Sequence, residues 1–339
     1  MKKLITLMIL LCMVTYNYAG DPARKGTTGA DQLLIPVGAQ GIATGGAMLA
    51  NLKGLESIYY NPAGLDHGSG TEAMFSYMSY LADINISYFA AATRIEGIGS
   101  IGLSLKSFEV GDIPVTTVEF PDGTGAMYSP ALLTLGLTYS KIITDRISVG
   151  ANFKFISETI ENSVANGFAL DFGVQYRFNE QIGISASVKN IGSNMRYSGG
   201  GLQQQTSIPG TLPGYKNGVF EIVSEEFQIP SYFELGASYN YIFNQQNNLL
   251  VGGTYTANNA LEDIINLGME YSFMKTFFVR GGYRMFTENN KNTPFGFTAG
   301  AGVNYEVMQG VGLVFDYAYQ DVKDFPTSNH IFTLKFQLK

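Results

Sequence analysis

The chain has 339 residues, of which 45% are hydrophobic and only 14% charged, and its formal net charge is −7. Sparse charge together with 23 Phe and 21 Tyr excludes an intrinsically disordered chain. The acidic balance argues against a nucleic-acid-binding protein, which would need a basic face. The single cysteine, Cys12, excludes a disulfide framework and a cysteine-rich zinc site.

The first residues have the pattern of a secretory signal peptide. Two lysines precede an apolar run that is too short to span a bilayer, since a membrane helix needs about twenty residues. Ala19 then lies at a small-residue cleavage site, so we expect residues 1–19 to be removed on export. A lipoprotein acylated at Cys12 is the less favoured alternative, because Leu11 stands where a small residue is expected.

Residues 20–70 do not alternate and are rich in glycine, with apolar residues between the glycines. They are too apolar for a free tail. We therefore expect them to fold inside the lumen of the domain that follows, as a plug.

From residue 71 onward, apolar and polar residues alternate with period two. Phe233, Leu235 and Tyr239 share one face of such a segment, and Glu234 and Ser238 share the other. Strict alternation over this length predicts strands rather than helices. The predicted strands number about fourteen and cover residues 71–80, 85–95, 98–108, 130–142, 146–157, 166–178, 181–190, 231–243, 247–256, 263–273, 276–287, 294–306, 309–320 and 328–339.

Two all-β folds could use these strands. A soluble sandwich has strands of about five or six residues, whereas outer-membrane barrels use strands of about nine to eleven, which is closer to the length seen here. Tyr and Phe near the strand ends fit the aromatic girdles of a membrane barrel. We therefore predict an all-β fold, an antiparallel transmembrane β-barrel spanning residues 71–339.

The predicted connections are unequal in length. Most are tight turns, but residues 109–129 and 191–230 form long loops. Short turns on one rim and long loops on the other are typical of outer-membrane barrels, so we expect outer-membrane lipid and lipopolysaccharide as surroundings. With an even strand count, both termini are expected on the periplasmic side.

Several polar groups are candidate site residues. The alternation places seven charged residues on the lumen face, where they would line a path or pair with one another: Asp171, Arg177, Glu234, Glu270, Arg280, Arg284 and Asp316. The loop carboxylates Glu225, Glu226, Glu262, Asp263, Asp321 and Asp324 could hold a hard cation, but solvated acidic loops are commoner, and we expect no metal.

Two further patterns carry no expected chemistry. Residues 97–102 match G-x-G-x-x-G but open a strand, so no helix N-terminus follows to hold a pyrophosphate. His67 and His330 lie near predicted strand ends and have no apparent partners, so no nucleophile–histidine–acid set is visible. We therefore expect neither an enzyme nor a bound cofactor.

One turn stands out within residues 20–70. Pro62 fixes its own φ and pushes Asn61 into an extended conformation, Asn61 can bond to neighbouring backbone, and Gly64 allows a sharp exit. With Ala63 between them, these residues read either as a structural turn joining the plug to the first strand or as an element that lets the plug shift.

This turn also carries a resemblance. Residues 36–47, with the glycines of Pro-Val-Gly-Ala-Gln-Gly-Ile-Ala-Thr-Gly-Gly-Ala, and residues 57–65, with Asn-Pro-Ala-Gly, resemble the PorV/PorQ family within the wider FadL-like barrels. The resemblance implies fourteen strands and an Asn-Pro-Ala box in the plug. The chain departs from the family in lacking the acidic residues usual just before the box, and it ends on Lys339 rather than an aromatic residue.

Two functions follow from the resemblance. The first is a role in type IX secretion, in which outer loops contact exported proteins carrying a C-terminal sorting domain, or subunits of the translocon. The alternative is FadL-like uptake of hydrophobic molecules through the lumen. Uptake requires an apolar pocket, whereas the inward positions of the strands are mainly Gly, Ser, Asn and charged residues. That composition favours the secretion hypothesis.

Overall fold

The computed structural model describes residues 26–206, 218–288, 294–323 and 325–338. The predicted signal peptide at residues 1–19, Cys12 included, lies outside the described residues. So do Asp324, Lys339 and part of the second long loop.

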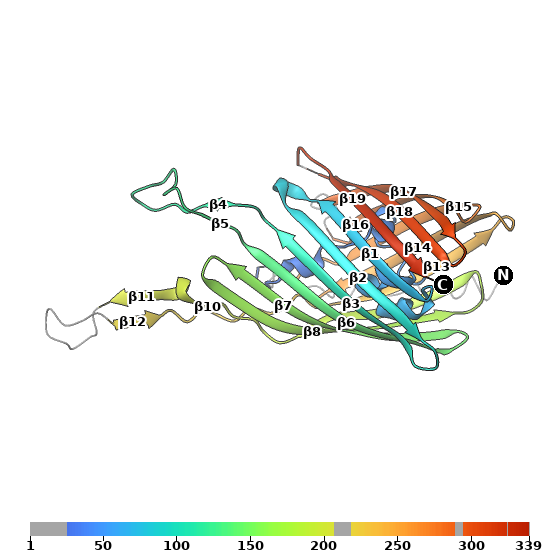
Figure 1. Cartoon of the computed structure of the whole chain (residues 1–339), viewed down its shortest axis with the longest axis horizontal. Coiled ribbons are helices and arrows are strands. Elements are labelled where there is room, and N and C mark those ends of the chain that lie inside the picture. The colour runs from blue at the N-terminus through green and yellow to red at the C-terminus, as the bar shows by residue number, and fades with distance from the viewer. Residues whose placement is uncertain (1–25, 207–217, 289–293, 324, 339) are drawn as a thin grey trace.

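Fourteen antiparallel strands form one closed barrel, as predicted (Figure 1). β1 pairs with β19 and β8 pairs with β9, so the sheet closes without a free edge. Every predicted strand coincides with an observed one, and the ends differ by at most three residues. The strands are β1 (Thr71–Ser79), β2 (Asn85–Ile95), β3 (Gly99–Glu109), β6 (Ala131–Thr144), β7 (Ile147–Ile160), β8 (Ser163–Arg177), β9 (Ile182–Gly192), β13 (Tyr232–Ile242), β14 (Asn247–Asn258), β15 (Ile264–Phe273), β16 (Phe277–Phe286), β17 (Phe295–Met308), β18 (Val311–Val322) and β19 (Asn329–Leu338).

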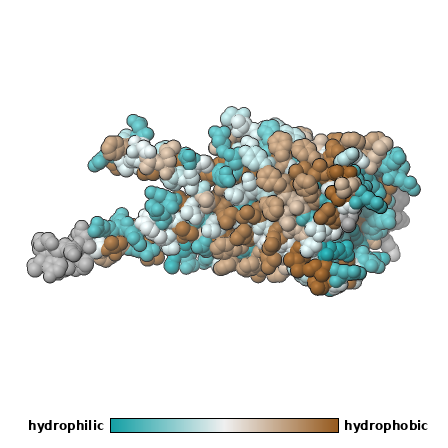
Figure 2. All heavy atoms as spheres, in the orientation of Figure 1, coloured by the Kyte–Doolittle hydropathy of each residue, from teal (hydrophilic) through white to brown (hydrophobic). Residues whose placement is uncertain are grey.

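The outer face of the barrel is apolar. Leu103, Val279 and Phe336 are each more than half exposed, at 61%, 62% and 51%. Hydrophobic side chains cover much of the barrel wall, and hydrophilic ones gather toward its ends (Figure 2). Since a large contiguous apolar surface is unfavourable in water, this band is the face that contacts lipid.

The two rims differ, and we name them by their connections. The short-turn rim carries the tight turns 96–98, 145–146, 178–181, 243–246, 274–276 and 309–310. The long-loop rim carries the other connections, including the small elements η5 (Leu81–Asp83), β4 (Ile113–Pro114), β5 (Met127–Tyr128), β10 (Ser198–Gly199), η6 (Gly200–Leu202), β11 (Gln203–Thr206) and β12 (Gly218–Glu221). The β4–β5 and β11–β12 hairpins project beyond the barrel (Figure 1).

Residues 26–70, which we call the plug, lie inside the barrel as short helical turns: η2 (Asp31–Leu34), α2 (Ala39–Ala43), η3 (Gly54–Glu56), α3 (Ser57–Tyr60) and η4 (Pro62–His67). Among the described residues, no helix is long and apolar enough to cross a membrane. Apolar plug residues pack against inward side chains of the wall, such as Ile42 against Ile331 and Leu55 against Met74. The core of the protein is therefore the interface between plug and wall.

Candidate functional site

The Asn-Pro-Ala-Gly turn fixes the plug to strands β7 and β8. Asn61 caps η4, since its Oδ1 accepts a hydrogen bond from the Ala63 amide at 3.1 Å, while its Nδ2 donates to the Val174 carbonyl at 3.1 Å. Pro62 occupies the first turn of η4, where no amide donor is needed. The predicted turn is thus the start of a 3₁₀ helix, whereas the sequence pattern indicated a turn without specifying its conformation.

Two wall glycines make this close approach possible. A Cβ at Gly150 would collide with the Pro62 carbonyl, and a Cβ at Gly173 would collide with the Asn61 side chain. Gly64 is equally crowded, because a Cβ there would meet the Leu52 carbonyl. The motif and its facing glycines therefore form one packed contact, with the geometry of a structural anchor.

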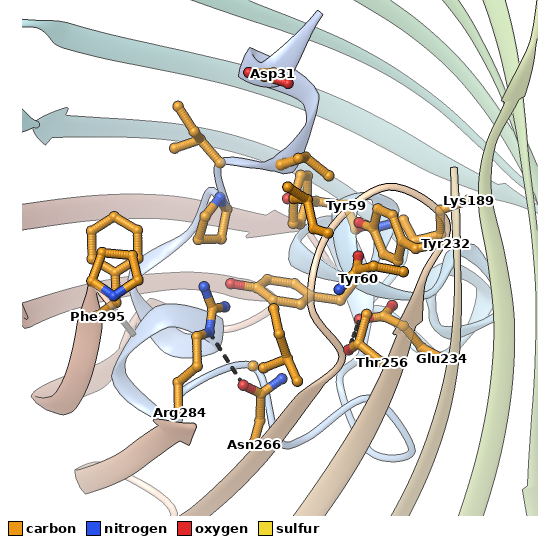
Figure 3. Close-up of a pocket in the computed structure, with 18 of the residues that line it drawn as sticks. Asp31, Tyr59, Tyr60, Lys189, Tyr232, Glu234, Thr256, Asn266, Arg284 and Phe295 are labelled. Carbon is orange, nitrogen blue, oxygen red and sulfur yellow. Dashed lines mark hydrogen bonds between the residues drawn. The ribbon is translucent and has the colours of Figure 1, made fainter. Parts of the chain in front are cut away.

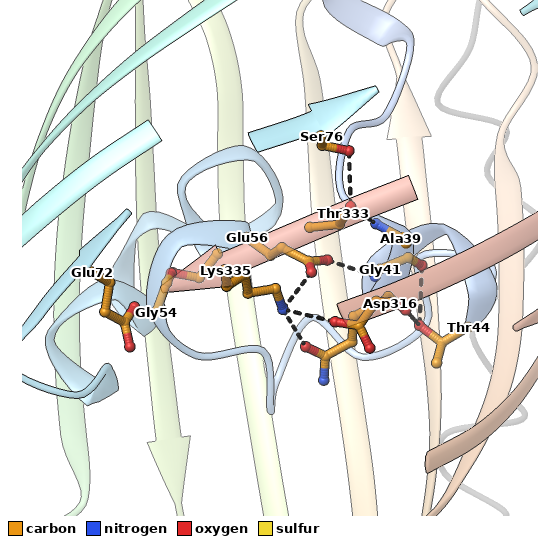
Figure 4. Close-up of polar contacts among 12 residues, drawn as sticks. Ala39, Gly41, Thr44, Gly54, Glu56, Glu72, Ser76, Asp316, Thr333 and Lys335 are labelled. Carbon is orange, nitrogen blue, oxygen red and sulfur yellow. Dashed lines mark hydrogen bonds and ion pairs between the residues drawn. The ribbon is translucent and has the colours of Figure 1, made fainter. Parts of the chain in front are cut away.

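A buried ionic network fixes the plug on the opposite side of the barrel (Figure 4). Glu56 is fully buried; its Oε1 lies 2.6 Å from Lys335 Nζ, and its Oε2 accepts a hydrogen bond from the Gly41 amide at 2.9 Å. Lys335 also lies 3.3 Å from Asp316, which in turn lies 2.5 Å from Arg280. The network links the plug to β16, β18 and β19.

An apolar cavity of about 440 Å³ lies above the plug, toward the long-loop rim (Figure 3). The plug lines it with residues that include Tyr59 and Tyr60, and strands β9 and β13 to β18 supply the rest of its strand lining. Its apolar lining consists of Leu34, Ile35, Pro36, Tyr59, Tyr60, Tyr80, Tyr232, Leu261, Ile264, Phe286, Pro294 and Phe295. Most of these residues lie in the plug, in loops or at strand ends, so the inward positions within the strands supply little of the apolar lining.

This cavity corrects an expectation. The inward strand positions are polar, as read from the sequence, and that composition argued against an apolar pocket. The plug and the rim supply the apolar groups instead. Leu34, Ile35 and Pro36 lie in a segment without alternation, so the strand pattern carried no signal for them.

One group of polar residues lines the cavity around Tyr59. Lys189 donates to the Tyr59 carbonyl, and its ammonium lies 4.2 Å from the centre of the Tyr59 ring. Burial raises the pKa of the Tyr59 hydroxyl well above its ordinary value, so this group stays neutral. Glu234 accepts hydrogen bonds from Ser187 and Thr256 at 3.1 and 3.2 Å. The lining of the cavity is thus mainly apolar, with polar groups at several points around it.

The structure brings most of the predicted lumen charges into pairs. Asp171 lies 2.6 Å from Lys154, and Glu270 lies 2.6 Å from Arg280. Arg284 donates to the Asn266 side chain at 3.2 Å in the wall of the apolar cavity. The inward lysines at positions 106, 154, 189 and 335 were missed, although their place in the alternation marks all four.

The weaker candidates have structural contacts. His67 Nε2 lies 3.1 Å from Ser148, and His330 Nδ1 lies 2.8 Å from the Tyr317 hydroxyl, so the expectation that both lack partners was wrong. Residues 97–102 form a turn and the start of β3, with no helix after them. Among the described residues, no group of three or more His, Cys, Asp or Glu is arranged to hold a metal ion.

Comparison with known proteins places this fold. The outer membrane protein β-barrel domain matches residues 131–339. None of the curated proteins matches the chain in sequence. Three solved structures are similar over 90% of this chain and 98% of their own: the Pseudomonas putida toluene transporter TodX (12% identity, TM-score 0.58), the CymD monoaromatic hydrocarbon channel (13%, 0.57) and a Pseudomonas aeruginosa FadL homologue (13%, 0.53). Identities this low show a shared fold alone.

Proposed function

The chain belongs to the outer membrane protein β-barrel domain family, and on this premise we propose that it binds small hydrophobic molecules in its barrel and passes them across the outer membrane. The observation that carries the proposal is the apolar cavity of about 440 Å³ above the plug. Concave, mainly apolar sites of this size with a few polar groups are typical of small-molecule sites. Similarity to a toluene transporter and a monoaromatic hydrocarbon channel favours this chemistry over an aqueous pore.

The plug determines how far a bound molecule can travel through the barrel. It separates the apolar cavity from a polar cavity of about 260 Å³ on its other side, which Glu270, Arg280 and Lys335 line. A hydrophobic molecule that enters at the long-loop rim therefore stops on Tyr59 and Tyr60. Its onward passage requires the plug to shift or the molecule to leave through the wall.

Fluorescence tests the proposal directly, because the chain contains no tryptophan. Phe295→Trp places the only indole at the cavity, and Phe297→Trp, two residues away on β17, places it on the lipid face, where Phe297 is 52% exposed. A brominated monoaromatic hydrocarbon should quench the fluorescence of Phe295→Trp saturably. It should quench that of Phe297→Trp only in proportion to the amount of hydrocarbon that partitions into the detergent. Equal, non-saturable quenching of both would refute binding in the cavity.

A blocking variant supplies the second control. Thr256→Phe fills part of the cavity from β14, whereas Val251→Phe on the same strand points outward. Combined with Phe295→Trp, the first should abolish saturable quenching and the second should leave it unchanged.

The secretion hypothesis has one observation in its favour. Apolar side chains are exposed on the β4–β5 hairpin, with Val118 at 100% and Phe120 at 57%, and just after β12, with Val223 at 75%. Such residues suit contact with another protein. An exported protein with a C-terminal sorting domain should then be retained by the intact chain and lost when Phe120 and Val223 are both changed to Ser.

A further inference from the structure

A second polar cavity, of about 320 Å³, lies between the plug and the short-turn rim. Lys53 reaches it from the plug and Arg177 from the end of β8, and side-chain amides line much of the rest: Asn51, Asn179, Gln181, Asn240 and Asn248. It lies on the far side of the plug from the apolar cavity, and the proposed function makes no use of it.

Arg177 is the unusual group in this cavity. Its Nε and Nη2 atoms are buried, and neither has a hydrogen-bond partner within the part of the chain that the structure describes. Buried guanidinium donors without an acceptor are costly, so they call for an explanation. Other inward cations are satisfied: Lys154 by Asp171, Arg280 by Glu270 and Asp316, Lys335 by Glu56, and Lys106 by the carbonyls of Gln32 and Ile35.

The two cations also act on neighbouring groups of the plug. Partial desolvation, and then the neighbouring Arg177 charge, lower the pKa of Lys53. Burial lowers the pKa of His67 to about 4, with the charges of Arg177 and Lys53 as the next causes. The Asp66 carboxylate raises the pKa of His67 and Arg94 lowers it, so His67 responds to Arg177 and Lys53 together with these two groups.

The carboxylates near this cavity do not cancel that charge. Glu270 lines it but is bound to Arg280 at 2.6 Å. Glu180, on the turn after β8, also lines it, but its side chain is exposed and forms no ion pair with Arg177 or Lys53 in the described chain. Two cations thus face one space in which, among the described residues, no carboxylate is paired with either of them.

We propose that this cavity is a binding site for a small oxyanion, held between the Arg177 guanidinium and the Lys53 ammonium. The planar guanidinium presents parallel N–H donors that match a carboxylate, phosphate or sulfate group, and the ammonium adds a point charge. The side-chain amides supply further donors. The site does not depend on passage of hydrophobic molecules, so either proposal can fail without the other.

His67 provides the test, because the chain has only two histidines. In protein labelled at histidine Cε1 and held in an uncharged detergent, NMR follows both rings through a pH titration. Sodium sulfate is compared with sodium chloride at equal ionic strength, because sulfate stays a dianion throughout this range. Bound sulfate should raise the pKa of His67 above about 4 in a saturable way, while the His330 signal, at the other rim, should not respond.

Variants assign the effect to the site. Arg177→Gln should raise the pKa of His67 in chloride and abolish the response to sulfate. Lys53→Gln, a change on the exposed side of the plug, should weaken sulfate binding severalfold and covers the case in which Arg177→Gln does not fold. Arg146→Gln, on the same rim but outside the cavity, is the matched control and should behave as the unchanged protein.

Repeating the titration with phosphate and with trifluoroacetate, a carboxylate that stays ionised throughout this range, identifies the ligand class. A stronger response to trifluoroacetate indicates a carboxylate ligand, and a stronger response to phosphate indicates a phosphate. No response to any of the three anions, or an equal response in Arg177→Gln, would overturn the proposal.

Discussion

Replacement of Lys335 by Met should loosen the plug without opening the barrel. The substitution removes the cation that lies 2.6 Å from Glu56 Oε1 and 3.3 Å from Asp316, and both carboxylates are fully buried. Removing one partner of a buried ion pair costs about 3–5 kcal/mol, because the remaining charge is left without compensation. Each 1.4 kcal/mol is a factor of ten, so local opening of the plug should become roughly 100- to 5,000-fold more frequent.

Hydrogen exchange measures this opening residue by residue. The amide of Gly41, which donates to Glu56, should exchange faster in Lys335→Met, while amides of β7 and β8 should not change. Arg94→Met is the matched control. Its ion pair with Asp66 spans 3.6 Å and its side chain is 50% exposed, so removing it should cost about 0–1 kcal/mol.

A double variant separates the loss of the Glu56–Lys335 attraction from the cost of leaving Glu56 charged and buried without a partner. Glu56→Gln combined with Lys335→Met removes two charges of the network together, so it should destabilise the plug less than the two single changes added. Equal exchange at Gly41 in Lys335→Met and Arg94→Met would refute the reasoning that the buried network holds the plug.

Three further changes test other contacts. The fold lowers the pKa of His67 to about 4, so between about pH 6.5 and 4 the unfolded chain binds more protons than the folded chain. The urea midpoint of unfolding should therefore fall as the pH drops through this window. His67→Gln should make this fall smaller. Gly173→Ala should weaken plug docking by about 1–3 kcal/mol, measured by exchange at Ala63, whereas Gly281→Ala, where a Cβ has its nearest neighbour at 3.8 Å, should be neutral. Glu158 accepts hydrogen bonds from Gln32 and Tyr197, so Glu158→Gln should speed proteolysis within residues 218–230 roughly tenfold, and the exposed Glu161→Gln should not.

The strands could be predicted closely from the sequence for a physical reason. A wall between lipid and a polar interior forces strict alternation, and side chains such as Phe233 and Glu234 obey it. The position of the Asn61 turn was equally visible, because Pro62 and Gly64 restrict the backbone locally.

The site depends on contacts that alternation does not encode. The pattern places Arg280 and Asp316 inward, but it does not give the strand register that brings them to 2.5 Å. It likewise does not show that Asp171 has a cationic partner, while the buried Nε and Nη2 of Arg177 have no hydrogen-bond partner among the described residues. The apolar cavity was missed because its floor comes from the plug, whose fold follows from contacts distant in sequence.

Transport itself tests the central claim most directly. Three kinds of vesicle are prepared with lipopolysaccharide in the outer leaflet, which slows unaided entry of hydrocarbons: one holds the purified chain, one holds Thr256→Phe and one holds no protein. Each is mixed with a radiolabelled monoaromatic hydrocarbon, and its transfer to an enclosed acceptor is timed. The account predicts saturable transfer that is faster with the unchanged chain and slowed by Thr256→Phe. Equal transfer in all three preparations would contradict it.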